Sequence, residues 1–228
     1  MKANVEYINH SGYLVETENH ILLVDYVKGD LPEFDKPTLI IATHSHPDHF
    51  NQDILGIEGP VRILLSSDIK EEYNLPYQSN VFYIEPNAKR FIGDFQVETF
   101  GSTDKGISVF VYVDNIGIFH AGDLNLWIWE DEDTQEDKME MSKDFDKEIK
   151  NIRRKNVEIA MFPVDPRLGK YATSGVTYFI DIVKPTYLFP MHFWGNVEIL
   201  HELKEHNRSL KTEVFVPEHD NYKFNIET

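Results

Sequence analysis

Short apolar runs separated by turn residues dominate the first part of the chain. β-Branched, aromatic and aliphatic side chains are concentrated in residues 5–8, 13–17 and 21–26, and Ser11-Gly12 and Asn19-His20 separate these runs. Runs of this length with turns between them predict a meander of antiparallel strands. Residues 37–43 form a longer apolar run, which predicts a buried strand.

The pattern beyond residue 50 first alternates between helix and strand and then changes. It predicts a short helix or turn at 51–57, a strand at 61–65, and a helix capped near Ser67. From Asn80 to His120 strands follow one another, and we expect a second sheet to begin there. These expected strands are residues 81–84, 90–92, 95–100, 107–113 and 116–120.

Residues 130–148 carry a dense run of Asp and Glu. Met141, Phe145, Ile149 and Ile152 recur at helical spacing, which favours an amphipathic helix with a solvated acidic face over an acidic metal-binding tail. The remaining pattern predicts a strand at 157–164, a helix at 173–183, a strand at 186–189, a helix opened by Asn196, and short strands at the end.

The composition narrows the class of protein. With 228 residues, 41% of them hydrophobic, the chain suits one globular domain, residues 1–228, and no apolar segment is long enough to span a membrane. The first residues lack the apolar core of a signal peptide, so we expect a cytoplasmic protein without membrane contact. The formal net charge of −17 disfavours nucleic acid as a partner and leaves a small molecule as the expected substrate.

A histidine cluster follows the buried strand. Thr43-His44-Ser45-His46-Pro47-Asp48-His49-Phe50 contains three imidazoles and a carboxylate, and the chain contains no Cys, so only His, Asp and Glu are available to hold a metal such as zinc. The spacing prevents all four from sharing one helix face, whereas a turn at Pro47 would let one pair bind one metal and the adjacent pair a second. A His-rich surface loop is the alternative, but the carboxyl end of a buried strand is where open sheets place ligands.

Two further ligand candidates follow expected strands. Asp123 comes after Gly122, which lets the backbone turn the carboxylate into a cleft, and His192 ends the run that begins at residue 186. Each would be a weak signal alone, but together with the cluster they are strong. His10 lies in the first turn and could reach a site, but a lone turn histidine is more often a solvated or capping residue, which is the role we expect for it.

These motifs resemble the metallo-β-lactamase fold superfamily, in particular its branch of metal-dependent hydrolases that includes ascorbate-6-phosphate lactonase-like proteins. The resemblance rests on His44-x-His46-x-Asp48-His49, His120-Ala-Gly-Asp123, His192 and the opening Asn9-His-Ser-Gly-Tyr-Leu-Val-Glu. It implies a four-layer αβ/βα sandwich: two mixed β-sheets face to face, helices on the outer faces, and two divalent metal ions in a cleft at one sheet edge.

The resemblance also implies a ligand set. His44 and His46 would bind the first metal, Asp48, His49 and His192 the second, and Asp123 would bridge both. The chain departs from the family in the loop of residues 100–108, where Ser102 falls closest to the position of the first metal's third histidine. Either Asp104 serves as an oxygen ligand, which would shift the preference from Zn toward Mn or Fe, or the first site is weak and can be empty.

The expected chemistry is hydrolysis by a metal-bound hydroxide, with Asp48 orienting the hydroxide and accepting its proton. Candidate substrates are a lactone, a phosphorylated sugar derivative, or another ester or amide. Arg167 is the candidate for holding an anionic group, and Trp127 and Trp194 are candidates for lining the pocket. Two alternatives stay open: a non-catalytic or mononuclear metal-binding or regulatory protein, and a nuclease, which the acidic charge opposes.

Overall fold

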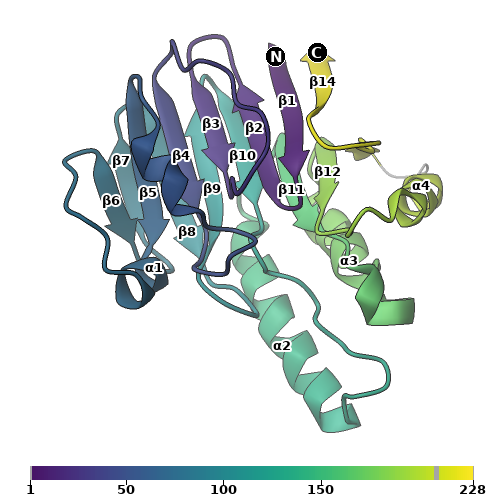
Figure 1. Cartoon of the computed structure of the whole chain (residues 1–228). Helices are drawn as coiled ribbons and strands as arrows, with labels where there is room; N and C mark the ends of the chain where they lie inside the picture. Colours follow the sequence, from purple (N-terminus) through teal and green to yellow (C-terminus); the bar gives the residue numbers. More distant parts are fainter. Residues whose placement is uncertain (1, 208–210, 228) are drawn as a thin grey trace.

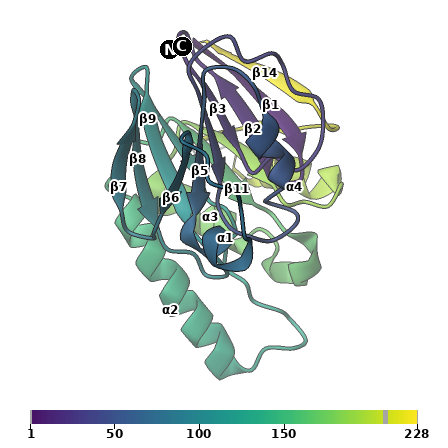
Figure 2. The same ribbon diagram turned by 60° about the vertical axis from the view of Figure 1, so that its left-hand side comes forward.

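The computed structural model describes residues 2–207 and 211–227; residues 1, 208–210 and 228 of the expected domain lie outside this description. The described strands form two seven-stranded sheets that lie face to face (Figures 1 and 2). The first sheet has the order β14 (Tyr222–Glu227), β1 (Lys2–Asn9), β2 (Gly12–Glu16), β3 (Ile21–Val24), β4 (Thr38–Ala42), β5 (Val61–Ser66) and β6 (Val81–Ile84). The second has the order β13 (Glu213–Val214), β12 (Tyr187–Met191), β11 (Ile159–Pro163), β10 (Ile116–His120), β9 (Ser108–Val113), β8 (Phe95–Phe100) and β7 (Lys89–Ile92).

Both sheets are mixed, as predicted. Strands β1, β2 and β3 form the expected antiparallel meander, and β3 to β6 pair in parallel. The prediction that a second sheet begins at Asn80 is wrong, because β6 pairs with β5 and the second sheet starts with β7. A strand reached through a helical crossover extends its own parallel sheet, and the apolar pattern of β6 does not record which partner it pairs with.

Apolar side chains cover both faces of the first sheet. In β3, β4 and β5, Leu22, Ile41 and Leu64 belong to the core between the sheets, while Leu23 and Ile40 belong to a second apolar cluster on the outer face. The 3-10 helix η1 (Gln52–Gly56) and helix α1 (Ser67–Glu72) contribute buried side chains to that outer cluster. Burial on both faces explains why these strands are continuous apolar runs rather than alternating ones.

Helices α2 (Gln135–Ile152), α3 (Ser174–Val183) and α4 (Val197–His206) lie on the second sheet, and the 3-10 helix η2 (Pro166–Tyr171) contacts α3. Helix α2 packs Phe145, Ile149 and Ile152 into the core as predicted, whereas Met141 of the same predicted face is half-buried and lies outside the core. The first half of α2 extends beyond the sheets (Figure 1). The four-layer sandwich is therefore confirmed. No described helix has both the length and the apolar character needed to cross a bilayer.

The observed starts of two helices can be compared with the predicted ones, and one of the two agrees. The Asn196 side chain caps α4 by accepting a hydrogen bond from the Ile199 N–H, as predicted. Helix α1 starts one residue earlier than expected: Ser66 is its N-cap and makes no side-chain capping bond. The Ser67 hydroxyl instead donates to Glu85 at 2.6 Å.

Two close backbone contacts hold the loops at the sheet edge that carries the cluster. A Cβ added at Gly106, where φ is +68°, would lie 2.2 Å from the Thr43 carbonyl oxygen, and one at Gly122, where φ is +54°, would lie 2.7 Å from that of Ile107. The Ile107 N–H also donates to the Thr43 carbonyl at 3.0 Å. The loop that contains Ser102 and Asp104 is thus fixed beside the end of β4.

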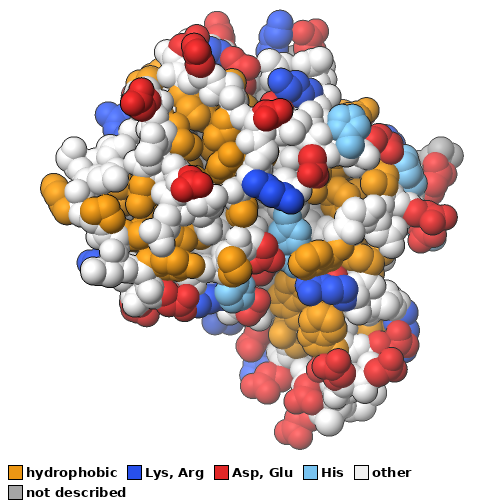
Figure 3. Space-filling view, viewed as in Figure 1, with side chains coloured by type: hydrophobic (Ala, Val, Ile, Leu, Met, Phe, Trp, Pro, Cys, Tyr) orange, Lys and Arg blue, Asp and Glu red, His pale blue; other side chains and the backbone are white. Residues whose placement is uncertain are grey.

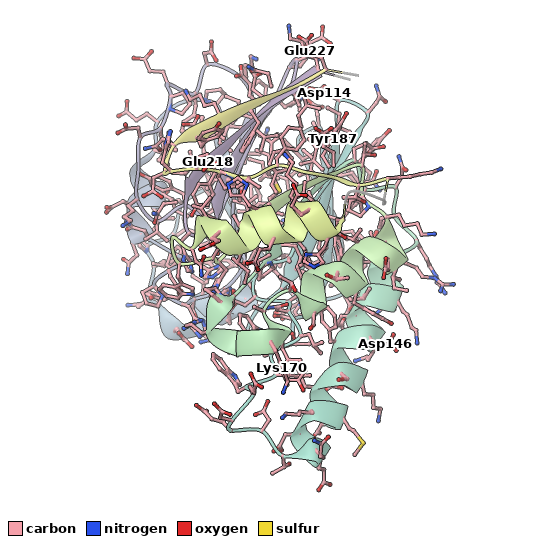
Figure 4. The ribbon with its side chains drawn as sticks, turned by 90° about the vertical axis from the view of Figure 1, so that its right-hand side faces the viewer. Asp114, Asp146, Lys170, Tyr187, Glu218 and Glu227 are labelled. Atoms are coloured by element: carbon pink, nitrogen blue, oxygen red, sulfur yellow. The ribbon has the colours of Figure 1, made fainter. Side chains whose placement is uncertain are left out.

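Asp114 lies at the opposite end of the sandwich, near Glu227 (Figure 4). Its carboxylate accepts hydrogen bonds from the Thr17 hydroxyl at 2.6 Å, the Asn19 backbone at 3.0 Å and the His20 ring at 3.0 Å. Burial raises the pKa of Asp114, but these hydrogen bonds lower it more, so it lies well below its usual value. The ionised carboxylate therefore joins the β2–β3 turn to the β9–β10 turn.

Asp114→Asn should lower the free energy of unfolding at neutral pH by about 1–2 kcal/mol, because a neutral amide replaces a charged acceptor. The folded-state pKa is depressed, so this contribution is present above about pH 4 and is lost as the pH falls below it. Urea unfolding should show the difference between wild type and variant shrinking on acidification. Asp94→Asn is the control: Asp94 is 79% exposed beside the same His20, and its replacement should change stability by less than about 0.5 kcal/mol. A pH-independent difference for Asp114→Asn would contradict this assignment.

Candidate metal centre

Two groups of ligand atoms meet at the end of the sandwich where β4, β10 and β12 stop. One comprises His44, His46 and Asp123, and within each group the ligand atoms lie within 4.8 Å of one another. The second group comprises His10, Asp48, His49 and His192. In the space-filling view, histidine and carboxylate surfaces lie in a hollow bordered by apolar and cationic side chains (Figure 3).

Asp123 lies between the two groups and offers one oxygen to each. Its Oδ2 is 3.3 Å from His44 Nε2 and 3.8 Å from His46 Nδ1. Its Oδ1 is 3.0 Å from His49 Nε2 and 3.6 Å from His192 Nε2, and this buried oxygen makes no hydrogen bond to the described residues. A buried carboxylate oxygen surrounded by imidazole nitrogens fits a divalent cation, so the residues present suit a metal pair.

Buried Asp25 orients the cluster through hydrogen bonds on the side away from the centre. It follows β3 and accepts hydrogen bonds from the Thr43 N–H at 2.7 Å, the Thr43 hydroxyl at 2.7 Å and His49 Nδ1 at 2.8 Å. His44 Nδ1 lies 3.1 Å from the Thr43 hydroxyl, which links His44 to the same carboxylate. With Nδ1 of each ring engaged as a donor, the Nε2 atoms of His44 and His49 face the centre, as in carboxylate–histidine–metal arrangements.

Asp165 plays the corresponding role for His192. It follows β11, is fully buried and lies 2.9 Å from His192 Nδ1. The same carboxylate binds the Arg167 guanidinium through Nε and Nη2, at 2.6 to 3.1 Å, and accepts from Trp194 Nε1 at 3.2 Å. Asp165 therefore connects the ligand His192 to Arg167 and Trp194 at the rim.

The charges of the centre are strongly coupled. Burial lowers the pKa of His49, but the carboxylates of Asp123 and Asp25 outweigh it and raise that pKa to about 10. Burial raises the pKa of Asp123, yet His49 and hydrogen bonds from the neighbouring histidines hold it well below its usual value. A cation that binds His49 must therefore displace a proton, which couples metal binding to pH.

Of Ser102 and Asp104, in the loop after β8, only Asp104 lines the cleft beside the ligands. Asp104 is exposed and lines the cleft together with His46, but its carboxylate is not among the atoms gathered with His44, His46 and Asp123. The Ser102 hydroxyl accepts from the Asp104 N–H at 3.2 Å. Ligation by Asp104 stays a prediction.

The expectation for His10 is wrong. Its side chain is only 12% exposed, and Nε2 lies 3.2 Å from Asp48 Oδ2. The turn between β1 and β2 carries it to the end of β12, where the His192 N–H donates to the His10 carbonyl at 3.1 Å. Asp25 and Asp165 are not among the predicted site residues. Both follow strands, and the same position after a strand led to the prediction of Asp123 as a ligand.

His120, part of the same motif as Asp123, is structural. Its Nε2 lies 2.8 Å from the Ser11 carbonyl, and its Nδ1 accepts from the Gly122 N–H at 3.0 Å. Burial lowers its pKa, so the ring is neutral. It ties the end of β10 to the β1–β2 turn.

A cleft of about 570 Å³ opens over the ligands and is lined by the predicted rim residues. Trp127 is buried and donates from Nε1 to the Asp123 carbonyl at 2.8 Å, while Trp194 is 52% exposed. Arg167 lies over Trp194 at 4.5 Å and over Trp129 at 5.7 Å from the ring centroids. The structure thus brings Arg167, Trp127 and Trp194 to one cleft beside the ligands.

Comparisons with known proteins identify the family of the chain. Residues 4–192 match the beta-lactamase superfamily domain. A UPF0173 metal-dependent hydrolase of Thermococcus kodakarensis is 24% identical over 211 residues, which cover 84% of each chain.

Three solved structures share the fold. A candidate metal-dependent hydrolase of Parabacteroides distasonis has a TM-score of 0.70 at 19% identity, covering 95% of this chain and 94% of its own. Igni18, a metallo hydrolase of Ignicoccus hospitalis, has a TM-score of 0.68 at 15% identity over 100% of both chains. CmlA, a diiron β-hydroxylase of Streptomyces venezuelae, has a TM-score of 0.63 at 12% identity, covering 99% of this chain and 54% of its own. The chain belongs to the beta-lactamase superfamily and has the metallo-β-lactamase fold.

Proposed function

We propose that the protein is a metal-dependent hydrolase of a small molecule and that it holds two divalent ions. His44 and His46 would hold the first, with Asp104 as the candidate for a further oxygen ligand. Asp48, His49 and His192 would hold the second. Asp123 would bridge them, and the ions would be Zn, with Mn or Fe as alternatives because the donor set mixes imidazole and carboxylate.

The position of Asp123 is the observation that carries this proposal. Each Asp123 oxygen faces a separate group of imidazoles, and buried Oδ1 makes no well-aligned hydrogen bond to the described residues. Asp25 and Asp165 add a second layer that fixes the ring orientations. The sequence similarity to the metal-dependent hydrolase from Thermococcus kodakarensis also supports the proposed function.

The chain's own groups have distinct roles in the proposed reaction. Two bound divalent ions would supply an activated water and polarise the bond under attack. The adjacent His10 imidazole holds the pKa of Asp48 well below its usual range, so Asp48 is ionised at neutral pH. It can therefore accept a hydrogen bond from the attacking water and orient it.

Arg167 supports an anionic substrate, such as a lactone or ester that carries a carboxylate, or a phosphorylated sugar derivative. Asp165 engages Nε and Nη2, and Nη1 takes part in none of these bonds. The planar group is also held against two indole rings, which fixes its orientation at the rim. A guanidinium held in this way can bind a carboxylate or phosphate of a substrate in the cleft.

Metal removal and reloading test the proposal. The chelated protein should lose turnover on a panel of lactones, phosphate esters and carboxylic esters, and reloading with Zn, Mn or Fe should restore it. Turnover that survives chelation would contradict a metal-dependent reaction. One ion per chain without turnover would instead favour the mononuclear or regulatory alternative, which is motivated by the position of Asp104 outside the first ligand group.

Arg167→Met should raise KM for anionic substrates by at least about tenfold and change kcat little, because it removes a charge-assisted contact outside the bond being cleaved. Neutral analogues should be affected much less. Lys170→Met, in the same η2 segment, is the matched control: Lys170 pairs with Glu130 at 2.6 Å and is 61% exposed. Equal losses for anionic and neutral substrates would contradict an anion-binding role.

A further inference from the structure

We propose that His10 is a ligand of the second metal through Nε2, and that the second site is consequently the stronger of the two and fills first. The proposal rests on the metal centre of the proposed function and adds to it a residue and an order of loading. It concerns binding and can be tested without turnover.

The position of the His10 ring is the first support. Its ligand atom lies within 4.8 Å of those of Asp48, His49 and His192. His10 Nε2 is buried and, although 3.2 Å from Asp48 Oδ2, has no well-aligned hydrogen-bond partner among the described residues. A buried imidazole nitrogen in this state is costly unless something else occupies its lone pair. A cation shared with the neighbouring ligand atoms would do so.

The His10 backbone is the second support. His10 has φ of +52°, a left-handed conformation that is unfavourable for a non-glycine residue. Other described non-glycine residues with positive φ are mostly Asn or Asp, and Asp25 at +51°, His192 at +63° and Trp194 at +52° border the centre as well. A two-residue hairpin turn would favour Gly or Asn at such a position. A histidine there indicates that its side chain offsets the strain.

The packing around His10 fixes the ring in this place. Its centroid lies 4.2 Å from that of His192 and 4.6 Å from that of Trp194. The hydrogen bond from the His192 N–H to the His10 carbonyl joins the two residues through the backbone. The ring is therefore preorganised by the fold, and binding a cation would require little movement.

The ligand count then sets the order of loading. The second site gains His10 in addition to Asp48, His49, His192 and one Asp123 oxygen, whereas the first gathers His44, His46 and the other Asp123 oxygen. Three imidazoles favour zinc more strongly than two, and among the gathered ligand atoms only the second group has a carboxylate, Asp48, besides the shared Asp123. The first ion to bind should therefore occupy the second site.

Zinc titration of the metal-free protein against a chromophoric chelator tests the proposal. Wild type should bind one ion tightly and a second more weakly. His10→Asn suits the left-handed backbone but cannot reach the centre, and His10→Gln can offer an amide donor to Asp48. Both variants should weaken the tighter step by at least about tenfold, leave the weaker step nearly unchanged, and alter the Co²⁺ absorption spectrum. His20→Gln, at a buried histidine at the far end of the sandwich, should leave both steps unchanged.

The other outcomes overturn the proposal in distinct ways. Wild-type zinc affinity in both His10 variants would exclude ligation. Loss of affinity in His10→Asn with recovery and an unchanged Co²⁺ spectrum in His10→Gln would make His10 a positioning residue for Asp48. A wild type that binds no zinc would overturn the metal centre itself, whereas tight zinc binding without turnover would contradict only the hydrolase assignment.

Discussion

Asp123→Asn should remove the metal pair and lower turnover by roughly a thousandfold or more, the largest effect expected of any single change in the protein. Each Asp123 oxygen faces a different ligand group, at 3.3 Å from His44 Nε2 and 3.0 Å from His49 Nε2. An amide replaces one of these oxygens with an NH₂ group, which cannot ligate a cation and would point at imidazole nitrogens or at a metal. Both sites therefore lose affinity together.

Turnover at saturating metal and elemental analysis of the gently purified variant measure this effect. Asp133→Asn is the control, because Asp133 lines the same cleft but is not among the gathered ligand atoms. Its replacement should change turnover by less than about threefold. Two retained ions and near wild-type turnover in Asp123→Asn would exclude a bridging role.

Asp25→Ala should destabilise the metal-free protein by about 3–5 kcal/mol, because it leaves a buried imidazolium and the Thr43 donors without their acceptor. The side chain of Asp25 is inaccessible and bonds His49 Nδ1 at 2.8 Å. Zinc affinity should fall by about 10–100-fold, since the ring of His49 loses the partner that orients it.

Urea unfolding of the metal-free protein and zinc competition measure the two effects separately. Asp25→Asn keeps the size of the side chain and suits the positive φ of +51° at this position, so it should be less destabilising than Asp25→Ala. Equal unfolding midpoints for wild type and Asp25→Ala would show that the carboxylate does not hold the cluster in place.

Local patterns made most of the fold predictable from the sequence. Apolar runs predicted nearly all the strands, and helical spacing of apolar residues predicted α2 and α3. The Asn196 cap predicted the start of α4. The assignment of β6 failed because sheet membership depends on pairing between distant strands, which local apolarity does not encode.

The ligand cluster was predictable because its residues are adjacent in sequence and follow a buried strand. His10, Asp25 and Asp165 were harder to recognise, since each is a single polar residue after a strand or in a turn, where solvated residues are common. Their roles depend on the inward direction of the side chain. For His10 and Asp25 that direction follows from left-handed backbone conformations, which residue type alone does not reveal.

Anomalous diffraction from crystals of the zinc-loaded protein tests the central claim most directly. Two peaks should appear at the end of the sandwich where β4, β10 and β12 stop, both in contact with Asp123: one beside His44 and His46, the other beside Asp48, His49 and His192. At limiting zinc only the second peak should be present. A single peak at saturating zinc, or peaks that do not contact Asp123, would contradict the shared two-metal centre.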